Sequence, residues 1–409
     1  MNISKKILTS AVTATILLSL TACGGGDDGG TIIPAQPSET QGGGESNPQS
    51  TISKENLSGE ITSDMTLTAD KVWVLNGLVA VKNGATLTIE PGTTVVGKAG
   101  TGANTSYLVV DAGSKINAAG TAANPIVFTS ETKYDGGADA WGQWGGLTII
   151  GNAGNAQLEP YEVNPNFVAG SSNMADNSGV LTHVEILNSG ITMEENKEIN
   201  GLSLVGVGSG TTVENIKVDL SDDDGIEIWG GTVNLSNIEI TRCSDDHFDI
   251  DDGYSGTVNN LNITVTTGNA GVEMSGETAA TFDRFNILVS ESAKEGGIYF
   301  KKDGIGGHFS NGTVTYNNAD NGYGAIHSKG VFDSANTSFA NVTLNGSSAA
   351  KFTGDSASGL ETAFDAGSTI SKENLSGEIT SDMTLTADKV WVLNGLVAVK
   401  NGATLTIEP

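Results

Sequence analysis

Short β-branched segments return along this chain at intervals of one solenoid turn, and this spacing restricts the fold more than any other feature. The equivalent positions Glu227, Asp249, Glu273 and Tyr299 are separated by 22, 24 and 26 residues. A parallel β-helix uses about this many residues for each coil, and its coils stack ~4.8 Å apart. A β-sandwich needs turn signals every ~8–12 residues, so it would not produce this return.

The segments between the returns have the composition of strands and turns. Alternating runs bounded by Gly, Asn and Asp begin after residue 51, and no segment shows a sustained helical period. We therefore predict an all-β chain with a single right-handed parallel β-helix. With ~24 residues per coil, about thirteen coils would form a rod on the order of 60 Å long.

Two segments resemble a known superfamily. Residues 84–97 and 123–130 are similar to coils of the right-handed parallel β-helix superfamily that includes pectate lyases, and the resemblance covers about residues 60–365. Residues 223–235, followed by Asp245 and Asp246, resemble uncharacterised surface lipoproteins of Gram-negative bacteria with this fold. The superfamily resemblance implies that acidic polysaccharides are cleaved either by paired carboxylates or by lyase chemistry with calcium and a basic residue.

The N-terminus has the features of a processing signal. Lys5 and Lys6 precede the apolar run Ile7 to Leu20, which is too short for a permanent membrane helix. Leu20-Thr21-Ala22-Cys23 resembles a bacterial lipobox, which implies cleavage before Cys23, acylation of its thiol and sorting to the outer membrane. The alternative is a soluble secreted protein cut near Ala22.

The expected domain organisation follows from these signals. We predict a signal peptide at residues 1–22, a flexible Gly-, Ser- and Asp-rich tether at 23–50 and the β-helix at 51–368. Residues 369–409 duplicate 51–91, as part of an identity that runs from Ser50–Pro91 to Ser368–Pro409 over 42 residues. We interpret the second copy as a truncated coil or an error in the sequence record, and alternatively as a second β-helix domain or a docking coil.

The net charge of the chain restricts the kinds of molecule that it can bind. The chain has 20 Lys and Arg against 48 Asp and Glu, a formal net charge of -28, and only two arginines. A basic surface that follows phosphates is absent from this composition, so we expect no nucleic-acid partner. An anionic surface of this kind attracts divalent cations.

Acidic residues concentrate in two neighbouring coils. Stacked carboxylates would repel one another, and calcium, which takes six to eight oxygen ligands, would offset that repulsion. Turn chemistry, in which Asp binds its own backbone, and catalysis are the two alternatives. The candidate calcium ligands are Asp222, Asp223, Asp224, Asp245, Asp246, Asp249, Asp251 and Asp252.

A catalytic interpretation would use Glu227, Asp249 and Glu273 as acid and base on adjacent coils. The chain lacks the Gly-His-Gly and Arg-Ile-Lys segments that are typical of polygalacturonases. Gly306-Gly307-His308 resembles the first of these segments only weakly. We leave the question of enzymatic activity open and favour a protein without it.

Four further residues attract attention because of their type. Trp141 and Trp144 are candidates for an aromatic platform under sugar rings, with packing of a coil end as the alternative. His247 lies among the acids, and we interpret it as an ordinary surface histidine, with a place in the lining of the acidic site as the alternative. Cys243 has no disulfide partner once Cys23 is acylated, so we expect it to be a small buried residue.

Together these observations favour an outer-membrane-anchored β-helix lipoprotein, on the cell surface or the periplasmic face. We expect a calcium-stabilised binding or scaffold module whose partners are the membrane, through the lipid, and a glycan or another surface component. The alternative is a polysaccharide lyase or glycoside hydrolase.

We expect mass spectrometry of the mature protein to find an N-terminal Cys23 that carries a diacylglyceryl group, because a well-formed apolar segment and a lipobox precede it. Replacement Cys23→Ser should release the protein from the membrane fraction. An unmodified N-terminus at any other residue would contradict the lipoprotein interpretation.

Overall fold

The computed structural model describes residues 52–155, 160–171, 173–194, 197–290, 294–318, 322–347, 351–368, 371–386 and 389–408. All of these belong to one compact unit, Thr51–Pro409. The predicted signal, Cys23 and the tether lie outside the described residues. Within the described part of the chain, no helix is long and apolar enough to cross a membrane.

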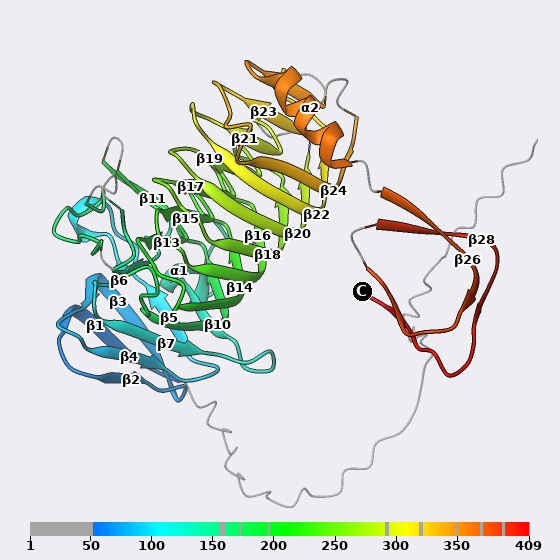
Figure 1. The fold of residues 1–409 in the computed structure, drawn as a ribbon. Coiled ribbons are helices and arrows are strands. Elements are labelled where there is room, and N and C mark those ends of the chain that lie inside the picture. Colours follow the sequence, from blue (N-terminus) through cyan, green and yellow to red (C-terminus); the bar gives the residue numbers. More distant parts are fainter. Residues whose placement is uncertain are drawn as a thin grey trace, which may run out of the picture. The chain divides into compact units, whose positions relative to one another are not determined.

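Nearly all strands belong to one parallel sheet of 23 strands that winds into a right-handed β-helix (Figure 1), as the sequence predicted. The strands are β1 (Ser53–Ile61), β2 (Met65–Leu67), β3 (Lys71–Val81), β4 (Thr86–Ile89), β5 (Thr94–Gly97), β6 (Tyr107–Val110), β7 (Lys115–Ala119), β8 (Ile126–Ser130), β9 (Leu147–Ile150), β10 (Gly179–Leu187), β13 (Leu202–Val205), β14 (Thr212–Asp219), β15 (Ile226–Trp229), β16 (Asn234–Thr241), β17 (Phe248–Asp251), β18 (Thr257–Val265), β19 (Val272–Met274), β20 (Ala279–Val289), β21 (Ile298–Phe300), β22 (Gly306–Tyr316), β23 (Ile326–Ser328), β24 (Thr337–Asn345) and β25 (Phe352–Gly354).

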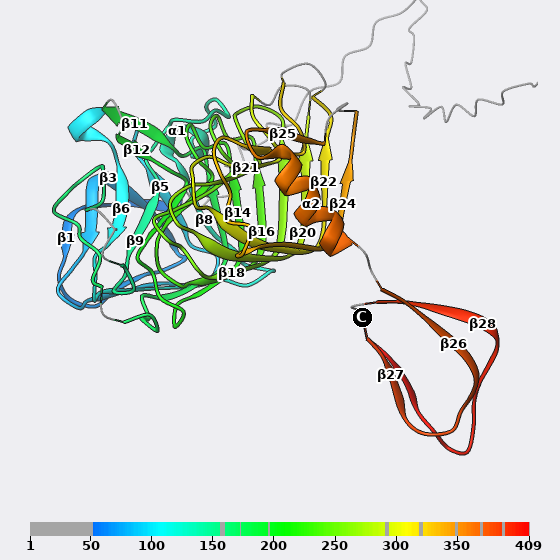
Figure 2. The ribbon, with the colours of Figure 1, turned by 45° about the horizontal axis from the view of Figure 1, so that its top comes forward.

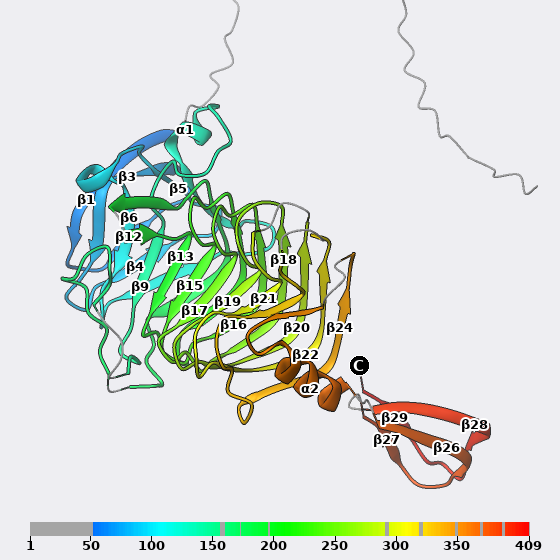
Figure 3. The same ribbon diagram turned by 90° about the horizontal axis from the view of Figure 1, so that it is seen from above.

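One face of the β-helix carries the short strands, and we call it the short-strand face. It stacks β9, β13, β15, β17, β19, β21, β23 and β25 in parallel register (Figure 3). With β1, β3 and β6 this column has eleven strands, fewer than the thirteen coils that we expected. The difference arises because insertions between β8 and β9, after β9 and after β10 take up residues without adding coils.

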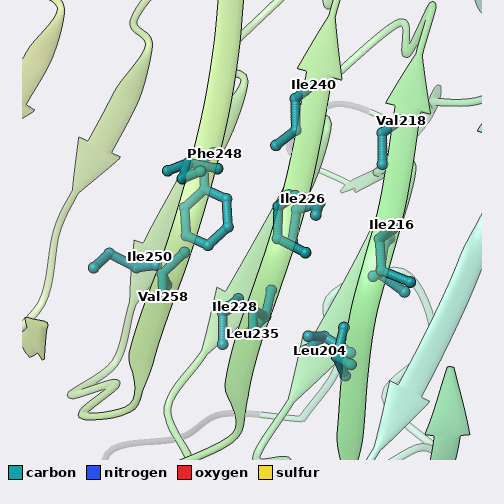
Figure 4. Packing of buried hydrophobic residues seen from close by; sticks show 14 of the residues in the cluster. Leu204, Ile216, Val218, Ile226, Ile228, Leu235, Ile240, Phe248, Ile250 and Val258 are labelled. Atoms are coloured by element: carbon teal, nitrogen blue, oxygen red, sulfur yellow. The ribbon is translucent and has the colours of Figure 1, made fainter. Parts of the chain in front are cut away.

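The interior of each coil is filled by apolar side chains that alternate with outward-facing polar ones. Ile226 and Ile228 of β15 point inward and stack over Phe248 and Ile250 of β17 (Figure 4). Phe282, Phe309 and Phe339 stack in the same way, with ring centroids 5.1 and 5.3 Å apart. Each fully buried side chain of this size stabilises the fold by roughly 1.5–3 kcal/mol, so the stacked columns hold the coils together.

The long strands bend at one position on successive coils. The residue at the bend has a positive φ of 50–58°, and Asn accepts this left-handed conformation more readily than most residues. Asn260 donates to the Asn237 side chain across neighbouring coils at 2.8 Å. The residues at the bend are His183, Asn215, Asn237, Asn260, Arg284, Asn311 and Asn341.

Three insertions interrupt the coils early in the β-helix. The first contains α1 (Glu131–Tyr134), and a short 3-10 helix (Gly102–Asn104) precedes it. The second follows β9, and the third forms an antiparallel hairpin of β11 (Ile191–Glu194) and β12 (Lys197–Ile199). The last two insertions cover outward apolar residues of β6, β9 and β13 and bury Tyr161, Phe167 and Ile199 in a second core.

A helix that the sequence analysis missed ends the β-helix. α2 (Ala357–Ser368) packs against β24 (Figure 2) and adds the fully buried Leu360 to the main core. Only Leu360 and Phe364 mark its apolar side, in a segment otherwise rich in small and polar residues, so the helical period was too weak to detect.

The C-terminal copy repeats the pairing of its N-terminal counterpart. β26 (Ser371–Ile379) pairs with β28 (Lys389–Val399) in the register of β1 and β3, and β27 (Met383–Leu385) pairs with β29 (Leu405–Ile407). Leu75 is 1 % exposed because β5 pairs with β3, whereas the equivalent Leu393 is 67 % exposed. The interpretations of this copy stay predictions.

The two identical segments offer a matched pair of substitutions. We expect Leu75→Ala to lower the free energy of unfolding by about 2–5 kcal/mol, because it leaves a cavity in the core. Leu393→Ala should change it by less than about 0.5 kcal/mol, because the side chain is exposed. Urea denaturation measures both. Equal losses would show that the second copy is covered in solution as the first one is.

Candidate functional site

Glu227, Asp249 and Glu273 form a column on the outside of the short-strand face. β15, β17 and β19 pair Glu227 with Asp249 and Asp249 with Glu273, which confirms the register that the spacing predicted. Tyr299 of β21 continues the column. Since neighbouring strands lie ~4.8 Å apart, three carboxyl groups are brought together along the helix axis.

Two pairs of consecutive Asp residues, Asp223-Asp224 and Asp245-Asp246, lie in the turns that lead into β15 and β17. We call Asp224 and Asp246 the inner members and Asp223 and Asp245 the outer members. The inner member of each pair accepts a backbone N–H from the next coil: Asp246 donates to Asp224 Oδ1 at 2.8 Å, and Ala270 donates to Asp246 Oδ1. Asn200 has the same role one coil earlier. Turn chemistry therefore accounts for one oxygen of Asp224 and one of Asp246. Of the outer members, Asp245 accepts a hydrogen bond from the Asn269 side chain on the next coil, and Asp223 is not explained by turn chemistry.

These turns form the floor of a groove with a volume of about 650 Å³. Its lining includes the acids Asp222, Asp223, Asp224, Glu227 and Asp245, together with Ser244, Asn269, Lys294 and Lys301. The insertions after β9 and β10 contribute Glu162, Thr192 and Glu198. Sequence reasoning missed these three residues because they lie outside the repeating coils, and no pattern in the sequence assigns them to the groove.

The carboxylates form three groups of three residues. Within each group, every residue offers one oxygen, and these three oxygens lie within 4.8 Å of one another. The first group is Asp223, Asp224 and Asp245, and the second is Asp224, Glu227 and Asp249. Because they share Asp224, we call these five residues the primary cluster. The third group, Asp246, Glu273 and Glu295, shares no residue with the other two.

Burial and mutual repulsion raise the pKa values of these acids. Desolvation, followed by the charge of Asp245, raises the pKa of Asp223 to about 9. Desolvation also raises the pKa of Glu162 to about 7. The pKa values of Asp224, Glu227 and Asp249 are well above their usual range for the same two reasons. The groove therefore requires protons or cations to offset its negative charge.

Two of the carboxylates are buried without the hydrogen bonds that normally accompany burial. Asp249 is 8 % exposed, and its Oδ1 has no hydrogen-bond partner among the residues that the structure describes. Glu273 is 1 % exposed, and neither of its oxygens has one, although Lys301 Nζ forms an ion pair with Oε1. Unpaired buried oxygens such as Asp249 Oδ1 and Glu273 Oε2 are costly, and a proton, a water molecule or a cation would stabilise them.

Three of the predicted calcium ligands lie outside the three groups. Asp222 lies on the rim of the groove. Asp251 forms an ion pair with Lys302 at 3.4 Å. Asp252 adopts a left-handed φ of 52° and donates its N–H to Asp251 Oδ1, which is the geometry of a turn.

The prediction of a platform formed by two tryptophans is wrong for Trp144. This side chain is completely buried and stacks on Phe128 with ring centroids 6.3 Å apart, so it packs inside the coil. Trp141 is 40 % exposed. Trp229, which sequence reasoning passed over, lies outward on β15 two residues from Glu227 and packs edge-on against Tyr161. The alternation of inward apolar and outward residues in Ile226–Trp229 was the sequence signal that Trp229 lies on the same outward face as Glu227.

The interpretation of His247 as a surface histidine is also wrong. The ring is completely buried beside Cys243, and desolvation lowers the pKa of His247 to about 4. Cys243 is free and buried, as expected. Both side chains face the interior because they lie at the turn from the long strand into the short-strand face.

Comparisons with known proteins bear on the fold. A family model described as a pectate-lyase-like beta-helix domain matches residues 59–363. No curated protein matches the chain. Two solved structures of tailspike protein 2 resemble it at 13 % identity: the full-length protein from an Escherichia coli O157:H7 bacteriophage, with a TM-score of 0.30 over 67 % of this chain, and the enzymatically active domain from bacteriophage CBA120, with 0.34 over 80 %. The chain spans 37 % and 48 % of those two chains, and likenesses this distant say nothing about activity.

We expect the metal-free protein to lose stability as the pH rises from about 4 toward 9. A buried acid with a raised pKa binds a proton in the folded state that the unfolded state has already released, so the free energy of unfolding falls across this window. Urea denaturation in metal-free buffer should show a loss of at least about 1 kcal/mol between pH 5 and pH 8, the size of a one-unit pKa shift.

Asp223→Asn is the matched variant, because it removes one of the raised groups and should flatten the pH dependence. A stability that rises from pH 5 to pH 8 in the absence of metal would contradict the raised pKa values.

Proposed function

The chain belongs to the pectate-lyase-like β-helix family, and on this premise we propose that it is a glycan-binding module whose groove acts through bound calcium. The observation that carries the proposal is the primary cluster, with the buried and unpartnered Oδ1 of Asp249 in it. An all-oxygen donor set with flexible geometry suits calcium.

The primary cluster would hold the ion through Asp223, Asp224, Asp245, Glu227 and Asp249. Calcium would supply positive charge to a groove that otherwise repels anions, and it would accept oxygen atoms from hydroxyl or carboxylate groups of a sugar. Asn200 donates to Glu227 Oε2 at 2.5 Å and so orients one of the ligands. This bond leaves the other oxygen of Glu227 for the ion.

The rim of the groove suits a polar, hydroxyl-rich ligand. Ser244, Asn269 and Thr192 offer hydroxyl and amide groups, and Lys294 and Lys301 offer positive charge. Trp229 and Trp141 are the aromatic side chains that we propose as surfaces for sugar rings. A glycan with acidic groups would gain most, because a cation could bridge it to the anionic floor.

A hydrolase or lyase is the second candidate, and one observation favours it. Glu227, Asp249 and Glu273 stack one strand apart, a spacing near the ~5–5.5 Å of a retaining pair. However, an acid and a base need environments that push their pKa values apart. Here burial raises the pKa of all three, which suits cation binding better than acid and base catalysis.

We further propose that Cys23 anchors this module to the outer membrane and that the tether at residues 24–50 holds it away from the lipid surface. The lipobox-like segment supports this part of the proposal. In that arrangement the groove would meet glycans at the cell surface or in the periplasm.

We expect a soluble Cys23→Ser protein to retain alginate or polygalacturonate in calcium and to lose affinity at least about tenfold after chelation, because the cation bridges two anionic partners. Chelation should also lower the melting temperature, since a ligand at a hundredfold excess over Kd stabilises the folded state by about 2.7 kcal/mol. Affinity electrophoresis and calorimetry measure the two effects.

The double variant Asp223→Asn, Asp245→Asn should lose the calcium-dependent retention of glycan and show a smaller fall in melting temperature on chelation than the wild type. Glu239→Gln, which replaces an exposed carboxylate on a long strand, should keep both responses. A glycan affinity and a melting temperature that do not change when calcium is removed would contradict the proposal. Release of shortened glycan that depends on Glu227 and Asp249 would establish the enzyme instead.

A further inference from the structure

The third group of carboxylates lies one coil further along the helix axis than the primary cluster, and Lys301, which lines the groove, forms an ion pair with its Glu273. Asp246 lies in the turn before β17, Glu273 on β19 and Glu295 in the turn before β21, and one ligand oxygen of each lies within 4.8 Å of the others. We propose that these three residues form a second, separate divalent-cation site. The proposal rests on the proposed function in one respect, namely that calcium is the ion.

The group is more than a collection of surface acids. Glu273 is 1 % exposed and Asp246 is 3 % exposed. Oε2 of Glu273 and Oε2 of Glu295 are buried and have no hydrogen-bond partner among the described residues, whereas Oε1 of Glu273 forms an ion pair with Lys301. One oxygen of Asp246 accepts the backbone N–H of Ala270. Two carboxylate oxygens, Oε2 of Glu273 and Oε2 of Glu295, are therefore desolvated without a partner in one group, an arrangement that a cation would stabilise.

Charge indicates the valence of the ion. Lys301 forms an ion pair with Glu273 and is the one cation that the described residues place on this carboxylate. Three carboxylates and one ammonium leave two negative charges when all are ionised, and a divalent cation neutralises them. A monovalent ion would leave one charge buried, so the balance favours calcium over sodium or potassium.

The competing explanation is a proton shared between Asp246 and Glu273. Such a proton needs two carboxyl groups and gives Glu295 no role. A cation needs at least three ligands, and Glu295 brings the third into range from the next coil. Glu295 therefore distinguishes the two explanations, and it is partly exposed, so its replacement by Gln disturbs the core least.

A second cation changes what the groove can recognise. Ions at the primary cluster and at the Asp246 group would lie on successive coils, so positive charge would recur along the helix axis at about the coil spacing. This arrangement fits a polymer with repeating anionic groups better than a single charged sugar.

Calcium titration of the full mature chain by calorimetry, with calcium content measured by elemental analysis, tests the inference. We expect the Glu295→Gln variant to bind one calcium fewer than the wild type and to keep the ion of the primary cluster. The Asp223→Asn, Asp245→Asn variant should lose that ion and keep the one at Glu295. Glu239→Gln is the control and should bind as the wild type does.

Lys301→Met provides a readout that misfolding would not imitate. Removal of the ammonium takes away a positive charge beside the site, so calcium should bind the third group more tightly, by about tenfold or less in Kd. Weaker binding in this variant would overturn the assignment of Lys301 as a competing cation, and with it the charge balance on which the second site rests.

The outcomes separate the two proposals. If the wild type binds calcium and Glu295→Gln binds as much, the second site is wrong and the proposed function stands. If the wild type binds no calcium, both fail. If Asp223→Asn, Asp245→Asn loses every ion, the two groups act as one site and the inference is overturned.

Discussion

Parallel pairing between successive coils is the constraint on which the rest of the structure depends. Each strand of the short-strand face pairs in register with the one before it, so a residue on one coil has its counterpart directly above it on the next. Inside the coils this repetition stacks Ile226 on Phe248 and lets apolar columns exclude water. The burial of these columns supplies the free energy that holds the coils in place.

The same repetition brings like charges close together on the outer surface of the coils, where they repel one another. Any acidic residue that recurs at one coil position must lie about a strand spacing from its neighbours, and Glu227, Asp249 and Glu273 do so. Backbone amides satisfy part of the charge at Asp224 and Asp246, and Lys301 offsets part of it at Glu273. The oxygens that remain unpaired, above all Oδ1 of Asp249, are the reason for proposing cations.

The insertions give the acidic column its surroundings. The segments after β9 and β10 pack on outward apolar residues of the early coils and end beside the column, so a flat face becomes a groove with Glu162 and Glu198 on its wall. Desolvation by these walls contributes to the raised pKa values of Glu162 and Asp223.

The sequence by itself determined the solenoid and the register of the acidic column, because a coil repeat is a local pattern and a spacing of 22, 24 and 26 residues aligns positions without any knowledge of the rest. The tertiary structure alone decided which side chains meet across coils that do not share the pattern. Glu162 and Glu198 join the groove from two insertions, and Glu295 joins the third group of carboxylates from an irregular turn. Burial also separated Trp144, which packs inside, from Trp141, and placed His247 in the interior, since a residue's exposure depends on what the distant parts of the chain lay over it.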